Sequence, residues 1–374
     1  MGRNPAGTLY ALFFIVKTIR NTKTMPLALI VRENKQLVVE ELALPKYGPN
    51  DLLIKVTHAA QNPTDWKHVH FGFAKPGSIV GCDFAGEVVE VGKEATGNYT
   101  KGERVAGCVH GGLDASFGIR GSYSEYVVQE ASLVFRYPST LSSESAATIP
   151  LASISAALGL FHEMNLPFPP ATSGSSILVW GGSTSVGQYA IQLAKAAGCF
   201  VIVTASPARH AYLKELGADA CFDYKDSNVV SHIKEASKNN LAYAIDCISE
   251  NGSTATVCAT LTGSNPQVVT VLPGVSKEIP SHVTERSVMM YTIFGRKMHV
   301  FGQDHEVKPA DKAFAEKFYL QLSNILLPQA LVKPNKASKV AGGLNGVEQG
   351  FQMMMENKIA AEKLVYTMAE TSKP

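Results

Sequence analysis

The segment 177–187 carries the residues whose types and spacing most clearly predict a chemical role. It reads Ile-Leu-Val-Trp-Gly-Gly-Ser-Thr-Ser-Val-Gly, so a short apolar run ends in a glycine pair and three hydroxyl residues. A segment of helical pattern, Val186–Ala197, follows directly. This order places free backbone amides at a helix N-terminus, where they bind phosphate groups. The sequence therefore predicts a site for the pyrophosphate of a dinucleotide.

The same segment begins a βαβ unit. The apolar run Phe200–Thr204 follows the helix as a second strand. The three elements together form the first half of a Rossmann fold. The glycine pattern is Gly182-x-Thr184-x-x-Gly187, in which threonine stands where a second glycine is usual. Because of this departure, the alternative interpretation is a turn that has only a structural role.

The end of the second strand distinguishes between the two nicotinamide cofactors. Folds that bind NAD usually place an acidic residue here, which accepts a hydrogen bond from the ribose 2′-hydroxyl. This strand instead continues from Thr204 as Ala-Ser-Pro-Ala-Arg-His, without an acid. Ser206 can donate a hydrogen bond to a phosphate, and Arg209 can donate two parallel ones. We therefore predict NADPH, with a surface helix cap and a solvated arginine as the alternative.

Composition and charge describe a globular protein with a large core. The chain has 374 residues, of which 45% are apolar and 18% charged, and this length predicts two domains. A net charge of +2 gives no reason to expect a nucleic-acid partner. No apolar run reaches the ~18 residues that span a bilayer. The six cysteines are scattered, which predicts reduced, buried thiols.

The order of strands and helices predicts an α/β protein. Residues 25 to about 150 contain short strands separated by Gly, Pro and Asn, and residues 177 to about 305 alternate strand with helix, as in a doubly wound parallel sheet. A last strand, Lys363–Thr367, is expected to return to the first domain. The expected division is an extension, a β-rich catalytic domain, a dinucleotide-binding domain and a return segment, at 1–24, 25–160, 161–310 and 311–374.

Residues 1–24 differ from the rest of the chain. They hold an apolar run, no acidic residue and four basic ones, which are Arg3, Lys17, Arg20 and Lys23. This composition fits a mitochondrial presequence or a short signal peptide. It fits equally an upstream start, because Met25 directly precedes the first expected strand. We expect a dispensable extension on a cytoplasmic protein.

Three motifs resemble the zinc-independent branch of the medium-chain dehydrogenase/reductase superfamily. Asn62–Lys67 reads NPTDWK, Gly81–Gly92 reads GCDFAGEVVEVG, and Lys101–Val105 reads KGERV. The resemblance covers nearly the whole chain from Met25. It implies a GroES-like β-rich catalytic domain beside the Rossmann domain. The zinc-binding Cys and Gly-His-Glu motifs of the superfamily's alcohol dehydrogenases are missing at the matching positions, so catalytic zinc is not expected.

Within this branch the chain resembles most the fungal trans-acting enoyl reductases, which partner polyketide synthases. Four segments carry this resemblance: Gly181–Thr184, Phe222–Tyr224, Lys238–Ile248 and Tyr291–Gly295. Val186-Gly187 departs from it toward the quinone reductases. The resemblance implies an NADPH-dependent reduction of an enoyl thioester that is free or bound to a carrier protein. It also implies a polyketide synthase as partner, and a monomer or homodimer without a membrane or nucleic-acid partner.

The resemblance further implies which residues line the cleft between the domains. The pyrophosphate would lie over Ser183, Thr184, Ser185 and Val186, in agreement with the helix N-terminus expected there. The adenosine 2′-phosphate would contact Ser206, Pro207, Ala208, Arg209 and Tyr224. Further cofactor contacts would come from Thr64, Asp65, Trp66, Lys67, Val271, Leu272, Ile359 and Ala360. The substrate would lie along Ser155, Ala156, Ala157, Leu158, Gly159, Leu160, Phe161 and His162.

Lys67 and Ser155 are the candidates for the chemistry. Hydride addition to the β-carbon moves negative charge onto the thioester oxygen, and a donor aimed at that oxygen lowers the barrier. Lys67 could stabilise this charge or hold the cofactor, and Ser155 could donate to substrate or nicotinamide. The alternatives are a solvated loop lysine and a small residue packed inside a helix. His68, His70 and His110 are not expected to form a metal site.

Two other functions remain open from the sequence. One is a stand-alone quinone or small-enone reductase, which would use the same hydride chemistry. The other is a cofactor-binding protein without turnover, which would act as a redox sensor or scaffold.

Overall fold

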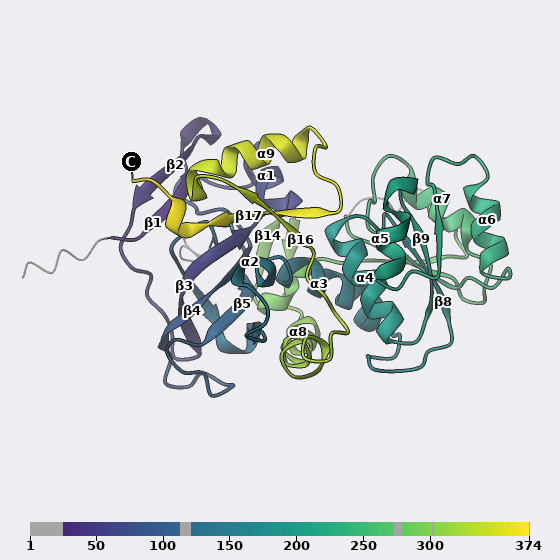
Figure 1. The fold of residues 1–374 in the computed structure, drawn as a ribbon, viewed down its shortest axis with the longest axis horizontal. Coiled ribbons are helices and arrows are strands. Elements are labelled where there is room, and N and C mark those ends of the chain that lie inside the picture. Colours follow the sequence, from purple (N-terminus) through teal and green to yellow (C-terminus); the bar gives the residue numbers. More distant parts are fainter. Residues whose placement is uncertain (1–24, 113–120, 273–278, 301–302, 374) are drawn as a thin grey trace, which may run out of the picture.

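Two β-sheets, one in each of two adjacent lobes, carry the fold (Figure 1). The computed structural model describes residues 25–112, 121–272, 279–300 and 303–373. The expected extension 1–24 lies outside these residues. The antiparallel sheet occupies the lobe with the purple and blue strands, and the parallel sheet occupies the teal and green lobe.

The parallel sheet has six strands in the order β10-β9-β8-β11-β12-β13, and every neighbouring pair is parallel. Its strands are β8 (Ser176–Trp180), β9 (Phe200–Thr204), β10 (Ala220–Phe222), β11 (Tyr243–Asp246), β12 (Gln267–Thr270) and β13 (Thr284–Ser287). The lobe's helices are α4 (Ser185–Ala196), α5 (His210–Glu215), α6 (Val229–Ala236) and α7 (Ser253–Thr260). This is the Rossmann strand order, so the doubly wound parallel sheet expected from the sequence is confirmed.

The mainly antiparallel sheet has seven strands, in the order β16-β17-β3-β4-β5-β7 with β6 also paired to β3. Its pairs are antiparallel except β16–β17, which is parallel. Its strands are β3 (Asp51–Ala60), β4 (Asp83–Val91), β5 (Arg104–Cys108), β6 (Tyr126–Glu130), β7 (Val134–Arg136), β16 (Lys336–Val340) and β17 (Glu362–Thr367). β17 pairs antiparallel with β3, so the chain returns to this sheet after the parallel sheet is complete. Two short pairs complete the strands: β1 (Leu27–Val31) with β2 (Leu37–Glu41), and β14 (Met298–Val300) with β15 (Gln303–His305).

Five helices accompany the antiparallel sheet: α1 (Pro63–His70), α2 (Ser143–Ala146), α3 (Pro150–Ala157), α8 (Pro309–Gln321) and α9 (Val347–Met355). The Ser142 side chain caps α2 by accepting from the Ser145 amide at 3.1 Å, as its position before an acidic first turn predicts. One buried apolar cluster includes Ala106 of β5, Ile154 of α3 and Val179 of β8. The two sheets therefore share a core with α3 between them.

The stretch Ser143–Glu163 meets the requirements for crossing a membrane by length and composition alone, with a mean hydropathy of 1.3. In the structure, 89% of its most apolar window is buried inside the protein. Its apolar character is therefore that of a core helix. None of the six cysteines forms a disulfide, and five of them are buried.

Candidate active site

A cavity of about 480 Å³ lies between the two sheets, where the residues that follow β8, β11 and β12 face α1 and the start of β17. Twelve of the predicted site residues line it: Thr64, Trp66, Lys67, Ser155, Ser183, Thr184, Ser185, Val186, Val271, Leu272, Ile359 and Ala360. These residues come from five separate stretches of the chain. The structure therefore brings about half of the predicted site residues together in one place.

The turn between β8 and α4 forms one wall of the cavity. Gly181 has a φ of +81°, and a Cβ at Gly182 would lie 2.1 Å from Cγ1 of Val203. A Cβ at Gly187 would lie 2.4 Å from the Gly181 carbonyl oxygen. The Thr184 hydroxyl accepts from the Gly187 amide at 3.0 Å and so caps α4. Glycine is therefore required at 182 and 187, whereas threonine at 184 replaces glycine because its side chain caps the helix.

This turn fits an anionic group. The first amides of a helix have no acceptor within the helix, and in α4 these include Ser185 and Val186, which line the cavity. The hydroxyls of Ser183 and Ser185 offer two further donors. Since the helix N-terminus also carries a partial positive charge, a pyrophosphate would be stabilised here by uncharged groups.

The residues predicted to read the 2′-phosphate lie beyond the cavity wall, just after β9 and β10. Pro207–Arg209 form one short helical turn, and Tyr224 is 47% exposed. Within the described residues, the Arg209 guanidinium forms no ion pair. The pKa of Glu362, a cavity residue, is lowered mainly by its hydrogen bond to Lys336 and to a smaller extent by the charge of Arg209. Arg209 is thus an unpaired cation near one end of the cavity.

Val271 and Leu272 line the cavity directly after β12. The loop after β11, to which the sequence assigned no role, holds this wall in place. The Asp246 carboxylate accepts from the amides of Ile248 and Ser249 at 3.0 Å and from the Ser253 hydroxyl at 2.6 Å. The Ser249 hydroxyl in turn accepts from the Val271 amide at 3.0 Å.

Lys67 lies at the cavity and has a partner from the other lobe. Its ammonium donates to the Glu250 carboxylate at 3.0 Å, and Glu250 also lines the cavity. Sequence reasoning missed Glu250, which follows β11 and stands 183 positions from Lys67. The ion pair bridges the two lobes, and it neutralises a lysine that the sequence suggested as a charge stabiliser.

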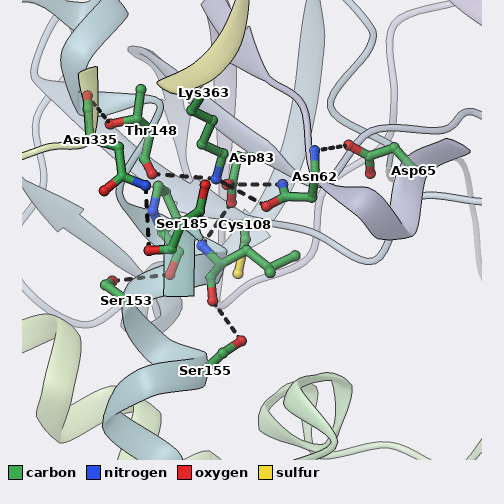
Figure 2. A network of polar contacts seen from close by, with 12 residues as sticks. Asn62, Asp65, Asp83, Cys108, Thr148, Ser153, Ser155, Ser185, Asn335 and Lys363 are labelled. Atoms are coloured by element: carbon green, nitrogen blue, oxygen red, sulfur yellow. Dashed lines mark hydrogen bonds and ion pairs between the residues drawn. The ribbon is translucent and has the colours of Figure 1, made fainter. Parts of the chain in front are cut away.

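Ser155 lies on α3, lines the cavity and is 6% exposed. Its hydroxyl donates to the Leu151 carbonyl one turn earlier, at 2.8 Å (Figure 2). The seven residues that follow it do not reach the described lining. Ala156, Ala157, Leu158, Gly159, Leu160 and Phe161 are buried in the core, and His162 contacts Asp311 at 3.1 Å. The contact of 156–162 with substrate stays a prediction, and the packing gives it no support.

Asp65 is also outside the cavity lining, although Thr64, Trp66 and Lys67 are part of it. Its carboxylate accepts from the Asn62 amide at 2.7 Å and from the Tyr123 hydroxyl at 3.0 Å. It therefore caps the start of α1. Burial raises the pKa of Asp65 to about 7.

A buried ion pair that the sequence did not predict supports the cavity floor (Figure 2). The ammonium of Lys363, on β17, contacts the Asp83 carboxylate at 2.5 Å, the Asn62 side chain at 3.0 Å and the Thr148 carbonyl at 3.3 Å. Asp83 also accepts from the Leu151 amide at 2.8 Å. Lys363 is 1% exposed and Asp83 0%. The network ties β17, β4 and the starts of α1 and α3 to one point.

Tyr291 is a further cavity residue to which the sequence assigned no role. Its hydroxyl contacts that of Thr64, and His68 lies against both. In the described part of the chain, no group of three or more His, Cys, Asp or Glu side chains could hold a metal ion. The expectation of a zinc-free site stays a prediction.

Two protein-family models each match one part of the chain. Residues 48–139 match the alcohol dehydrogenase GroES-like domain, and residues 185–309 match the family described as zinc-binding dehydrogenase. Among similar proteins, Trans-enoyl reductase ACTTS2 of Alternaria alternata is 34% identical over 343 residues, which are 91% of this chain and 98% of that protein. Trans-enoyl reductase caaB of Aspergillus niger is 33% identical over 345 residues, which are 88% and 93% of the two chains.

Solved structures share the fold. The CurK enoyl reductase superposes with a TM-score of 0.70 at 19% identity, covering 92% of this chain and 99% of that one. An alcohol dehydrogenase superfamily protein of Novosphingobium aromaticivorans superposes with a TM-score of 0.73 at 22% identity. The match covers 92% of this chain and 99% of that one.

Proposed function

Because the chain belongs to the alcohol dehydrogenase superfamily, in the family that includes the fungal trans-enoyl reductases, we propose that it is an NADPH-dependent enoyl reductase acting in trans to a polyketide synthase. The reaction saturates the α,β double bond of an acyl thioester. The observation that carries the proposal is the cavity between the lobes. It joins an anion-binding turn at Ser183–Val186 to a largely apolar wall at Val288–Met290.

The choice of NADPH rests on Ser206 and Arg209. Enoyl reductases of this superfamily use a nicotinamide cofactor. The residues between β9 and α5 include no acid, and Arg209 is the one basic side chain among them, so we expect it to meet the 2′-phosphate. A guanidinium forms strong, paired hydrogen bonds with phosphate oxygens. Tyr224, at the end of the neighbouring strand, offers an exposed ring to the same nucleotide.

The apolar wall supports an acyl substrate. Leu151, Val288, Met289, Met290 and Ile359 are apolar residues of the cavity lining. Methionine side chains are flexible and adapt to irregular apolar shapes. Such a wall suits an acyl chain whose length changes as a polyketide grows, presented on a carrier protein.

Hydride transfer to an enoyl thioester has two requirements that the residues of the protein must meet. The bound nicotinamide supplies a hydride to the β-carbon, and the thioester oxygen then gains negative charge. The residues of the chain must hold the double bond beside the cofactor and donate to that oxygen, since preorganised donors in a water-poor site lower the barrier. The sequence suggested Lys67 and Ser155 for this role, and it also suggested Lys67 as a cofactor contact.

A direct assay tests the proposal. Oxidation of NADPH by the purified full-length protein would be followed with crotonyl-coenzyme A, with a quinone and without acceptor. We expect turnover with the enoyl thioester and none without acceptor. Turnover of the quinone alone would favour the stand-alone quinone or enone reductase, for which the Val186-Gly187 sequence is the supporting observation. Binding of NADPH without consumption in any arm would favour a sensor or scaffold.

A further inference from the structure

We propose that the Tyr291 hydroxyl is the group that donates a hydrogen bond to the thioester oxygen as its negative charge develops, and that Thr64 and His68 position it. This inference rests on the proposed enoyl reduction. It assigns a catalytic role to a residue for which the sequence suggested none.

The two donors that the sequence suggested, Lys67 and Ser155, are already engaged, and so is the buried Lys363. The Lys67 ammonium is paired with Glu250 at 3.0 Å. The Ser155 hydroxyl gives its proton to the Leu151 carbonyl at 2.8 Å. The Lys363 ammonium is engaged by Asp83, Asn62 and Thr148.

A chain of hydrogen bonds behind Tyr291 has a defined direction. The Gly111 carbonyl can only accept, so its contact with His68 Nδ1 at 3.3 Å places the proton on Nδ1. His68 Nε2 is then an acceptor, and the nearer hydroxyl, Thr64 Oγ1 at 3.2 Å, donates to it. Tyr291 lies farther from Nε2, at 3.5 Å. Thr64 therefore accepts from Tyr291 through the contact between their hydroxyls.

This order leaves one proton free to change its acceptor. The Thr64 proton is held by His68, and the His68 proton is held by Gly111. The Tyr291 proton points at Thr64 Oγ1, on the cavity wall that both residues line. A carbonyl oxygen that arrives beside this hydroxyl can replace Thr64 as its acceptor by a rotation about the C–O bond.

The surroundings keep Tyr291 neutral and its ring fixed. The His110 ring stacks on the Tyr291 ring at 3.7 Å between centroids and 5° between planes. Burial raises the pKa of Tyr291 far above its usual value and lowers that of His68 to about 4. Near neutral pH the phenol therefore keeps its proton, and His68 stays in the single tautomer that the chain requires.

The balance of the step follows from this neutrality. The hydride and its electron pair add to the β-carbon, and the π electrons of the double bond move to the α-carbon and the thioester oxygen. Tyr291 donates a hydrogen bond to that oxygen and keeps its proton. A proton from water then adds to the α-carbon, which gives the saturated thioester.

The test is Tyr291→Phe in the full chain, assayed with NADPH and crotonyl-coenzyme A. Phenylalanine keeps the stack on His110 and removes only the hydroxyl. Loss of one oxyanion donor lowers kcat by about 100-fold in comparable sites, so we expect a fall of about that size with NADPH affinity unchanged. The matched control is Tyr319→Phe, because Tyr319 is equally buried and contacts Cys108 away from the cavity. It should leave kcat unchanged.

A kinetic isotope effect separates catalysis from structure. With NADPH deuterated at the transferred position, slower hydride transfer in Tyr291→Phe should raise the isotope effect on kcat above that of the wild type. If the substitution only lowered the fraction of correctly folded enzyme, kcat would fall while the isotope effect stayed at the wild-type value. That result would overturn the proposal. So would a Tyr291→Phe enzyme whose kcat lies within about twofold of the wild type.

Thr64 gives a second route if Tyr291→Phe does not fold. Thr64→Val removes the acceptor that positions Tyr291 and should lower kcat, whereas Thr64→Ser keeps the hydroxyl and should restore it. Equal rates for the two variants would contradict the positioning role. A wild-type protein that reduces no enoyl thioester would overturn the proposed function itself, and this inference with it.

Discussion

At the scale of single residues, we propose that the choice between NADPH and NADH depends on Arg209. Within the described residues, this arginine follows β9 and forms no ion pair. A hydrogen bond to a charged group contributes about 1.5–3 kcal/mol. We expect Arg209→Ala to weaken NADPH binding by about 10- to 100-fold and NADH binding by less than about threefold. Fluorescence titration of both cofactors measures this.

Lys214→Ala is the matched control for that prediction. Lys214 is an exposed cation on the neighbouring α5, and its loss should change both affinities little. Equal weakening of NADPH and NADH by Arg209→Ala would contradict the assignment of Arg209 to the 2′-phosphate.

The titration of Asp65 leads to a second prediction at the scale of single residues. Its pKa of about 7 in the folded protein lies above the value near 4 of an unfolded chain. The folded state therefore binds this proton more tightly, so the group's stabilising effect is complete below about pH 4 and is lost as pH rises through 7. As the pH rises from about 4 to 8, the free energy of unfolding of Asp65→Asn should therefore increase relative to that of the wild type. Urea unfolding measures the difference, and a difference independent of pH would contradict the prediction.

At the scale of elements, the buried pair Lys363–Asp83 joins β17 to β4 and to the starts of α1 and α3. Removing one partner of a buried pair leaves an uncompensated charge and costs about 3–5 kcal/mol. We expect Lys363→Met to lower the free energy of unfolding by this amount, measured with urea.

The neighbouring pair Lys336–Glu362 provides the control. Lys336 is 70% exposed, and exposed pairs contribute about 0–1 kcal/mol. Lys336→Met should therefore change stability by less than about 1 kcal/mol. A similar loss in both variants would show that the buried position of Lys363 has no special importance.

The elements also show where sequence patterns suffice. The central strands β8 and β9 were predicted because they are apolar runs covered on both faces of a parallel sheet. The Gly182–Gly187 turn was predicted because its constraints lie within a few residues. β16 reads Lys-Ala-Ser-Lys-Val and lies at the sheet edge, so it has no apolar pattern to detect. Its pairing with β17 decides its conformation.

Only part of the candidate site could be predicted from the sequence, because sequence patterns relate residues that are close in the chain. Lys67 and Thr64 belong to a recognisable segment, but their partners Glu250 and Tyr291 stand 183 and 227 positions away. Local spacing does not relate such residues. Residues 156–162 were predicted to contact substrate, and this stays a prediction. An apolar helix pattern does not distinguish a cavity wall from the core, and residues 156–161 are buried.

At the scale of the whole molecule, the two lobes share one core. The same apolar cluster includes Ala106 in the antiparallel sheet, Ile154 on α3 and Val201 in the parallel sheet. Neither sheet can separate from α3 without exposing apolar surface. We expect a single unfolding transition in calorimetry, moved as a whole to higher temperature by NADPH. Two transitions, with only one of them moved by NADPH, would show independent lobes.

The hydroxyl-rich turn at Ser183–Ser185 has a consequence for how the protein responds to its medium. It would hold the pyrophosphate with neutral donors, whereas Arg209 would hold the 2′-phosphate by charge. Screening acts on exposed charges, because the Debye length shortens from about 10 Å at 0.1 M salt to about 3 Å at 1 M. Ionic strength therefore weakens the discriminating contact more than the shared one. Selectivity between the two cofactors narrows in concentrated salt, while nucleotide binding itself persists.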